Sequence, residues 1–224
     1  MHKNFENSTY IRPDEHKFRW PNNDSNTWGI IAHDYINTIK PLIKILQEKS
    51  IIKNRGVFQA GGHCGLYPYM LTEYFDMIFT CEPNPVSFYC LVNNCQGNNI
   101  IKLNVALGKQ PGKMQSVCEY PDNTGMNRVV ETKDKYYIPM ITIDSLGLDD
   151  IDLMQLDLEG FEYDALVGAK ETIERNKPVI IVESTSDNVD TFLAEFGYVN
   201  WKKINRLDTM YVLAKDLDKL SDVK

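Results

Sequence analysis

The stretch Ile151-Asp152-Leu153-Met154-Gln155-Leu156, followed directly by Asp157-Leu158-Glu159-Gly160-Phe161-Glu162, decides how this chain folds. Its first half is a short apolar run of the kind that forms a buried strand. Its second half places three carboxylates and a glycine at the end of that strand. Burial of charge is costly unless the charge is paired or used, and ligands of open α/β sheets bind at the carboxyl ends of strands. The stretch therefore predicts a buried strand that ends at a functional site.

Strand and helix patterns alternate on both sides of this stretch. We expect strands at residues 56–60, 77–81, 100–106, 151–156 and 178–183, and helices at residues 66–74, 86–95, 162–176 and 189–196. Such alternation builds a mainly parallel sheet with helices on both faces. The last two strand patterns, 198–203 and 209–214, have no helix between them, so we expect them to pair antiparallel. The sequence thus predicts an α/β fold.

The remaining segments divide into three. Residues 1–26 are polar and contain Pro13 and Pro21, which predicts an extended arm, and residues 27–49 carry the pattern of an amphipathic helix. Residues 107–135 lose the strand–helix rhythm and are expected to form a loop or short hairpin, before a β-like segment at 136–143. We therefore expect an arm and helix over residues 1–50, packed on one globular domain over residues 51–224.

Composition excludes several classes of protein. The chain has 224 residues and a formal net charge of −7, which argues against a large basic surface for nucleic acid or anionic membrane. Its five cysteines lack the spacing of zinc sites and suggest reduced thiols in an intracellular protein. We find neither an apolar leader segment nor a membrane-spanning run. The expectation is a cytoplasmic protein with no membrane or nucleic-acid partner, and of undetermined oligomeric state.

Two motifs near the first core strand suggest a nucleotide-like ligand. The turn Gln59-Ala60-Gly61-Gly62-His63-Cys64-Gly65 joins that strand to a helix, where glycines allow close approach and helix N–H groups are free to donate. About 20 positions later, Glu82 ends the second strand, where an acidic residue accepts hydrogen bonds from ribose hydroxyls. Each motif alone is ordinary. Together they favour a nucleoside-containing cofactor, and the lack of a Walker sequence disfavours a nucleoside triphosphate.

A series of such motifs follows one order between about residues 55 and 215. The series comprises Gly61 to Gly65, Glu82-Pro83-Asn84-Pro85, Asn104-Val105-Ala106-Leu107-Gly108, Ile143-Asp144-Ser145-Leu146, residues 157–162, Leu166-Val167-Gly168-Ala169 and the strand ending in Glu183. It resembles the FkbM-type S-adenosylmethionine-dependent methyltransferases. The resemblance implies a Rossmann-like, seven-stranded, mainly parallel sheet with an antiparallel last strand, as in class I methyltransferases.

The resemblance also implies a set of cofactor contacts. These are Gln59, Gly61, Gly62, His63, Gly65, Glu82, Pro83, Asn104, Ala106 and Asp157. The methionine part would lie over the glycine turn, Glu82 would hold the ribose, and Asn104 and Ala106 would border the adenine. Asp157 would lie near the sulfonium. Three positions depart from the family pattern, because Gln59, His63 and Gln155 stand where an acid, an Asn and a Lys are usual.

Methyl transfer to a hydroxyl needs an aligned acceptor and a group that removes its proton. Asp157 is the first candidate base and His63 the second. Acceptor contacts are expected from the irregular segment, at Asn123, Thr124 and Asn127, and from Glu159. Asp157, Glu159 and Glu183 are also of the type that binds a divalent cation, although a metal-free site is the preferred hypothesis. Glu162 is interpreted as a helix-start acid.

The leading hypothesis is an S-adenosylmethionine-dependent O-methyltransferase. Its acceptor would be a hydroxyl of a sugar, a polysaccharide or a sugar-containing metabolite, as the resemblance implies. One alternative is a nucleic-acid 2′-O-methyltransferase with Asp157, Lys170 and Glu183 as its charged set, which the negative net charge disfavours. Another is a catalytically degenerate cofactor- or partner-binding module, for which the substitutions at Gln59, His63 and Gln155 leave room.

Overall fold

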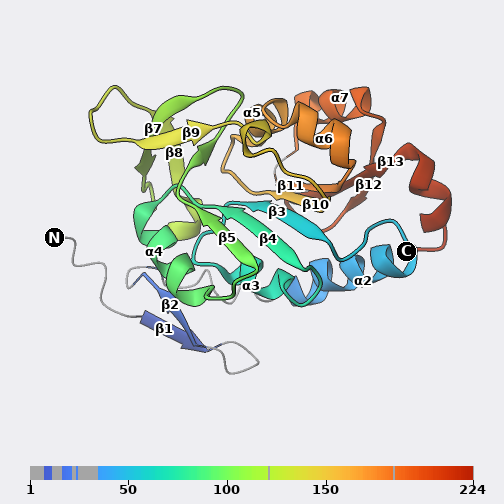
Figure 1. Cartoon of the computed structure of the whole chain (residues 1–224), viewed down its shortest axis with the longest axis horizontal. Coiled ribbons are helices and arrows are strands. Elements are labelled where there is room, and N and C mark those ends of the chain that lie inside the picture. Colours follow the sequence, from blue (N-terminus) through green and yellow to red (C-terminus); the bar gives the residue numbers. More distant parts are fainter. Residues whose placement is uncertain are drawn as a thin grey trace.

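The computed structural model describes residues 8–11, 17–21, 24, 35–120, 122–183 and 185–223. Its centre is a seven-stranded sheet in the order β12-β13-β11-β10-β3-β4-β5 (Figure 1). The strands are β3 (Gly56–Ala60), β4 (Met77–Cys81), β5 (Ile100–Leu103), β10 (Ile151–Leu156), β11 (Val179–Glu183), β12 (Tyr198–Lys203) and β13 (Asp208–Leu213). Strands β11, β10, β3, β4 and β5 are parallel, and β13 lies antiparallel between β11 and β12. The predicted fold class, including the antiparallel last strand, is confirmed.

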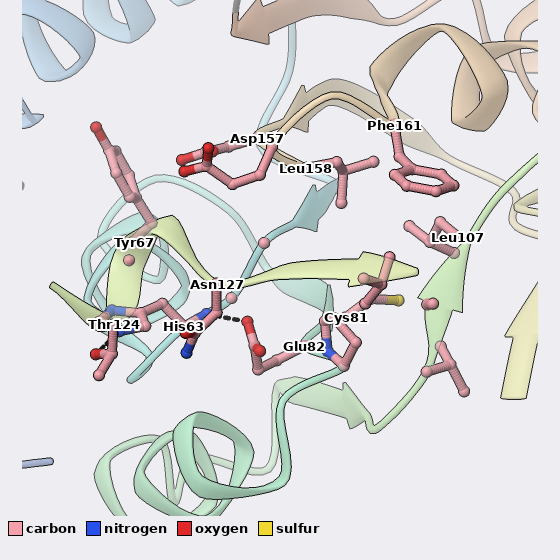
Figure 2. A pocket seen from close by; sticks show the side chains of 18 of the residues that line it. His63, Tyr67, Cys81, Glu82, Leu107, Thr124, Asn127, Asp157, Leu158 and Phe161 are labelled. Atoms are coloured by element: carbon pink, nitrogen blue, oxygen red, sulfur yellow. Dashed lines mark hydrogen bonds between the residues drawn. The ribbon is translucent and has the colours of Figure 1, made fainter. Parts of the chain in front are cut away.

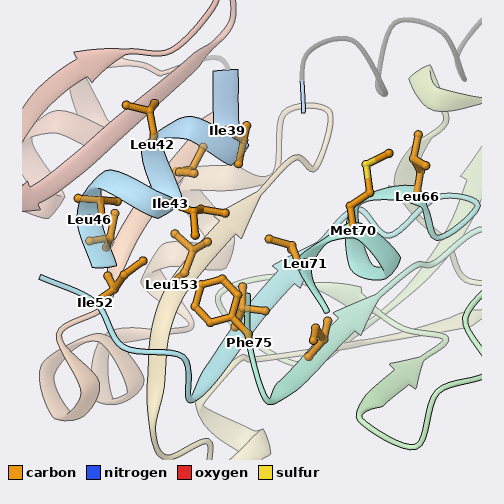
Figure 3. Packing of buried hydrophobic residues seen from close by; sticks show 14 of the residues in the cluster. Ile39, Leu42, Ile43, Leu46, Ile52, Leu66, Met70, Leu71, Phe75 and Leu153 are labelled. Atoms are coloured by element: carbon orange, nitrogen blue, oxygen red, sulfur yellow. The ribbon is translucent and has the colours of Figure 1, made fainter. Parts of the chain in front are cut away.

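Helices cover both faces of this sheet (Figure 1). Helices α2 (Lys40–Glu48), α3 (Leu66–Leu71) and α4 (Pro85–Asn94) lie on one side, and α5 (Glu162–Val167), α6 (Lys170–Asn176) and α7 (Asp187–Glu195) on the other. Successive strand residues point to opposite faces, so β10 sends Leu153 into the first core and Met154 and Leu156 into the second. Figure 3 shows α2 packing onto Leu153 from above. No helix in the described ranges is long and apolar enough to cross a membrane.

The N-terminal segment differs from the expected extended arm. Strands β1 (Ser8–Ile11) and β2 (Lys17–Trp20) form an antiparallel hairpin. Phe18 and Trp20 are buried, and the amide of Asn94 in α4 exchanges hydrogen bonds with the backbone of Arg19, at 2.6 and 2.8 Å. The hairpin forms because its two apolar side chains reach the core. Within the predicted helix 27–49, a π-helix over Tyr35–Ile39 leads into α2, and residues 27–34 lie outside the described residues.

A second sheet replaces most of the predicted irregular segment. Strands β6 (Ala106–Leu107), β7 (Gly112–Val117), β8 (Arg128–Glu131) and β9 (Ile138–Ile141) form it in the order β6-β9-β7-β8. Strands β7 and β8 pair antiparallel and form the short hairpin that the sequence allowed. The prediction of a loop was wrong for the rest of the segment, because β6 and β9 extend the hairpin into a four-stranded sheet. Met114, Val129, Ile138 and Met140 build a small core of their own. These apolar residues are too sparse along the chain to stand out as strands by pattern.

The single helix predicted over residues 162–176 is two helices, α5 and α6. The break falls at Gly168, where an added Cβ would lie 2.2 Å from the carbonyl oxygen of Gly108. The Gly168 carbonyl accepts a hydrogen bond from Asp144 N at 2.9 Å, and the Asp144 carboxylate accepts from Thr172 N at 2.8 Å, inside α6. These long-range contacts turn the chain. Short 3-10 helices complete the description: η3 (Thr124–Met126), η4 (Asp144–Leu146) and η5 (Ala214–Leu220).

Candidate active site

A pocket opens where the carboxyl ends of β3, β4 and β10 meet the second sheet. It encloses about 800 Å³ of space that is continuous with solvent. Its lining comprises Gly61, Gly62, His63, Leu66, Tyr67, Cys81, Glu82, Pro83, Val105, Ala106, Leu107, Thr124, Gly125, Asn127, Val129, Asp157, Leu158, Glu159 and Phe161. Figure 2 shows one end walled by Leu107, Leu158 and Phe161, and the other by polar side chains including His63 and Asp157. This lining, apolar at one end and polar at the other, suits a small-molecule ligand.

The glycine turn after β3 forms a cradle that only glycine permits. Gly61 has φ +83°, and a Cβ on it would lie 1.9 Å from the carbonyl oxygen of Asp157. A Cβ on Gly62 would lie 2.5 Å from side-chain atoms of Leu91 and Thr80. Both glycine N–H groups donate to the carbonyl of Cys81, at 3.0 and 2.9 Å. The turn is thereby fixed between β4 and β10, with its backbone facing the pocket.

Glu82 presents a prearranged carboxylate to the pocket. It accepts hydrogen bonds from His63 N at 2.8 Å and from Asn84 N at 2.7 Å, one on each oxygen. Burial raises the pKa of Glu82 to about 7, against the lowering effect of these two backbone donors. A carboxylate has about four acceptor positions, so two remain for a ligand. Glu82 can therefore accept from two hydroxyl groups of one bound molecule.

His63 belongs to a chain of buried hydrogen bonds that the sequence did not predict. Thr124 Oγ1 donates to the Asp24 carboxylate at 2.5 Å, so it must accept from His63 Nε2–H, 2.8 Å away. Asp24 also accepts from Thr124 N at 2.8 Å. Burial lowers the pKa of His63 to about 4, so the ring is neutral and Nδ1 carries no proton. Nδ1 is buried without a hydrogen-bond partner, which leaves it as an acceptor for a ligand.

Three carboxylates converge at the polar end of the pocket. Single oxygens of Asp157, Glu159 and Glu183 lie within 4.8 Å of one another. Burial, followed by the charge of Glu183, raises the pKa of Asp157 well above its usual range. Burial and the same neighbouring charge raise the pKa of Glu159 to about 7, and burial raises that of Glu183. The three carboxyl groups therefore bind protons more readily than isolated carboxyl groups do, and a nearby positive charge would oppose this effect.

Most of the predicted site residues line this pocket. Those in the lining are Gly61, Gly62, His63, Glu82, Pro83, Ala106, Thr124, Asn127, Asp157 and Glu159, and those outside it are Gln59, Gly65, Asn104, Asn123 and Glu183. Gln59 supports the turn from within the sheet, since its amide donates to the Gly61 carbonyl at 3.0 Å and accepts from Thr80 Oγ1 at 2.6 Å. Asn104 donates to the Glu82 carbonyl at 2.7 Å and steadies that strand end.

The other outlying residues are also in supporting positions. Gly65, with φ +92°, precedes α3, and Asn123 accepts a hydrogen bond from Gly125 N at 3.2 Å at the start of η3. Glu162 accepts from Leu158 N at 2.8 Å and from Gly160 N, as expected of a helix-start acid. The sequence prediction missed the lining residues Tyr67, Leu107, Leu158 and Phe161. Leu158 and Phe161 stand inside the opening motif, and their apolar character was the available signal.

Solved structures of other proteins share this fold. Magnesium protoporphyrin IX methyltransferase (ChlM) from Synechocystis PCC 6803, solved with bound SAM, is 10% identical with a TM-score of 0.50, over 85% of this chain and 86% of that chain. Trm5b from Pyrococcus abyssi is 11% identical with a TM-score of 0.52, over 92% of this chain and 56% of that chain. The fold is that of the class I methyltransferases, with the pocket at the carboxyl edge of the sheet.

The family follows from the sequence itself. The family model of the methyltransferase FkbM domain matches residues 65–199, and the chain belongs to this family of methyltransferases. A methyltransferase FkbM from Methylobacillus flagellatus KT is 19% identical with a TM-score of 0.49, over 71% of this chain and 43% of that chain. The chain thus spans less than two thirds of both the Methylobacillus and the Pyrococcus chains. Among curated proteins, none matches the sequence.

Proposed function

We propose that the chain is an S-adenosylmethionine-dependent O-methyltransferase whose acceptor is a hydroxyl of a sugar, a polysaccharide or a sugar-containing metabolite. The main support is that one pocket brings together the glycine cradle, the prearranged Glu82 carboxylate and Asp157. These three features come from the ends of β3, β4 and β10, which are neighbours in the sheet. Membership of the FkbM family supports methyl transfer as the reaction.

The residues of the pocket fit the cofactor in three parts. The side-chain-free backbone at Gly61 and Gly62 leaves room for the methionine part, and Glu82 has two acceptor positions for the ribose hydroxyls. The apolar end, with Leu107 and Phe161, suits the adenine ring. The orphaned Nδ1 of His63 suits a donor of the cofactor, for which we propose its ammonium group. When bound, S-adenosylmethionine supplies a methyl group attached to a positively charged sulfur.

Asp157 is the proposed proton acceptor of the reaction. Its carboxyl lines the pocket beside the glycine turn, and Asp157 N donates to the Ala60 carbonyl at 3.1 Å, which holds the residue at the strand end. Its pKa is raised by burial, and a positive charge close by lowers it, so the sulfonium of the cofactor would favour the ionised form of Asp157 that a base requires. His63 is less suited to this step, because burial disfavours its protonated form. We therefore assign His63 to binding rather than to proton removal.

The polar end of the pocket favours a neutral, hydroxyl-rich acceptor. Asn127, Asp157 and Glu159 offer oxygen acceptors to hydroxyl donors. An acidic pocket repels phosphate, which argues against a nucleic acid. Lys170, the cation required by that alternative, lies over the ring of Phe192 at 5.7 Å and is not among the pocket residues.

Cofactor binding is the first experiment. Isothermal titration of the full chain with S-adenosylhomocysteine should show one saturable site, which Glu82→Ala weakens by about 100-fold. Glu174→Gln is the matched control, since it also removes one negative charge but lies exposed on α6. Absence of binding at millimolar ligand would refute the proposal.

Acceptor class is the second experiment. Transfer of a radiolabelled methyl group to a panel of sugars, glycans and RNA should label the saccharides. Labelling of RNA alone would favour the 2′-O-methyltransferase, and binding without any transfer would favour the degenerate module.

A further inference from the structure

We propose that Asp157, Glu159 and Glu183 bind one divalent cation that prefers oxygen ligands, such as Mg²⁺ or Mn²⁺, with the carboxamide oxygen of Gln155 as a further ligand. The sequence alone favoured a metal-free site. We now favour a bound cation because of the positions of these four side chains in the folded structure. The existence of the site is independent of methyl transfer, whereas the role given to it below rests on the proposed function.

The geometry of the three acids suits a single ion. Leu156 pairs with Val182, so the next residues, Asp157 and Glu183, lie side by side at the ends of β10 and β11. Glu159 returns from the following turn, where its φ is +50°, and the three oxygens lie within 4.8 Å of one another. Two oxygens that share a cation at 2.0–2.6 Å lie at most about 4–5 Å apart. The acids are thus within coordinating distance of one point.

Gln155 supplies an independent indication of a ligand. Its side chain is 2% exposed, and its Oε1 is buried without a hydrogen-bond partner. Residues 155 and 157 point to the same face of β10, and Gln155 pairs with Ile181, two residues before Glu183. The carboxamide therefore lies one row below the Asp157–Glu183 pair on the same face. A buried carbonyl oxygen needs a partner, and beside three acids a cation serves all four groups.

The cluster also has no ion-pair partner among the residues that the structure describes. None of the ion pairs between described residues involves Asp157, Glu159 or Glu183. The nearby charges are those of Glu162 and Asp208, which are negative as well. The negative charge of Asp157, Glu159 and Glu183 is therefore left for an ion to balance.

The position of the ion suggests its use. Asp157 and Glu159 line the polar end of the pocket, so an ion between them is exposed to a bound acceptor. Two neighbouring sugar hydroxyls could complete its coordination, which would orient one oxygen and make its proton easier to remove. In this arrangement the acids hold the ion, and the ion selects acceptors with a diol.

The test is Mn²⁺ binding to the metal-stripped full chain, measured by isothermal titration and by the electron paramagnetic resonance signal of free Mn²⁺. We expect one site per chain. Glu183→Gln and Glu159→Gln should each weaken it at least tenfold, whereas the charge-matched control Glu174→Gln should not change it. If Glu183→Gln fails to fold, Glu159→Gln, at a half-buried residue in the turn after β10, carries the same test.

A second variant tests the charge argument. Gln155→Lys places an ammonium one row below the acids, so it should abolish Mn²⁺ binding and raise the melting temperature of the metal-free chain. Mn²⁺ binding by this variant as tight as wild type would overturn the assignment of Gln155 and the counter-charge argument.

The outcomes separate the inference from the proposed function. No binding up to millimolar Mn²⁺, or equal binding by wild type and Glu183→Gln, overturns the metal site. If S-adenosylhomocysteine still binds in that case, the proposed function stands and only the metal site fails. If Mn²⁺ binds but S-adenosylhomocysteine does not, the metal site stands and the proposed function fails.

Discussion

Two acidic regions lie at the pocket, Glu82 and the group of Asp157, Glu159 and Glu183, and they differ in how their negative charge is stabilised. Glu82 is buried, and each of its oxygens receives a backbone N–H, from His63 and Asn84. Asp157, Glu159 and Glu183 face one another, and no cation from the described residues pairs with them. The first carboxylate is stabilised by the fold, whereas the second group needs protons or a charge from outside. The carboxylate with backbone donors lies on the side where we propose that the cofactor binds. The three acids without a cationic partner lie on the side where we propose proton removal and an ion.

The largest loss of stability is expected from a substitution at Gly61, in the glycine turn beside Glu82. Gly61→Ala would place a Cβ 1.9 Å from the Asp157 carbonyl and force φ +83° on alanine, so the unfolding free energy should fall by about 3–5 kcal/mol. Urea denaturation measures this. Gly160→Ala is the matched control, because φ is +102° there but nothing lies within 4 Å of the added Cβ. The control should cost only about 1–2 kcal/mol. Equal losses in the two variants would show that the close packing at Gly61 is unimportant.

A smaller effect is expected when Glu82 becomes Gln. The amide can accept from only one of the two backbone donors, so the other N–H is left facing an NH₂ group. The unfolding free energy should fall by about 1–3 kcal/mol. The same change at Glu159 removes an acid that has no backbone donor in the described structure, and should leave the stability of the metal-free chain equal or higher at pH 8. A loss at Glu159 as large as that at Glu82 would contradict the comparison.

The pH dependence of stability sharpens the comparison further. Glu82 and Glu159 have folded pKa values of about 7, above the ordinary 4.5, so the folded chain binds more protons than the unfolded chain between these values. Stability of the ligand-free protein should therefore fall as pH rises from about 5 to about 7, by at most about 1.4 kcal/mol per pH unit for Glu82. Urea titrations at four pH values measure the slope. Glu159→Gln and saturating Mn²⁺ should each flatten it, and an unchanged slope in both would argue against the proposed cluster.

The smallest effect is expected from the buried chain behind His63. Thr124→Val removes the hydroxyl between Asp24 and the ring, which should cost about 1–2 kcal/mol and a few-fold in S-adenosylhomocysteine affinity. Nitrogen NMR should find the Nε2–H tautomer of His63 in the wild type and a mixture in the variant. Thr191→Val, at an exposed threonine of α7, is the control. A His63 tautomer that is the same in both proteins would show that Thr124 does not set it.

The fold and part of the site could be predicted from short-range patterns. Apolar runs, glycine turns and acids at strand ends recur at fixed local spacing, which is enough to order the strands and to bring Gly61, Glu82 and Asp157 to one sheet edge. The second sheet escaped prediction because its small core is spread thinly over residues 106–141. The break between α5 and α6 escaped because it depends on contacts with Gly108 and Asp144 rather than on the helix sequence.

The sequence by itself determined the class of fold, the edge of the sheet where the pocket opens, and the family, since each depends on residue types and their order. Only the tertiary structure decided which polar groups meet. Asp24 and Thr124 are 100 residues apart, and Glu183 lies 26 positions beyond Asp157, with a whole helical crossover between them. Their contacts follow from strand register and chain packing, which act through space and leave no local pattern. The same physical reason explains why Gln155, an ordinary core residue by sequence, becomes an unsatisfied oxygen beneath the acids.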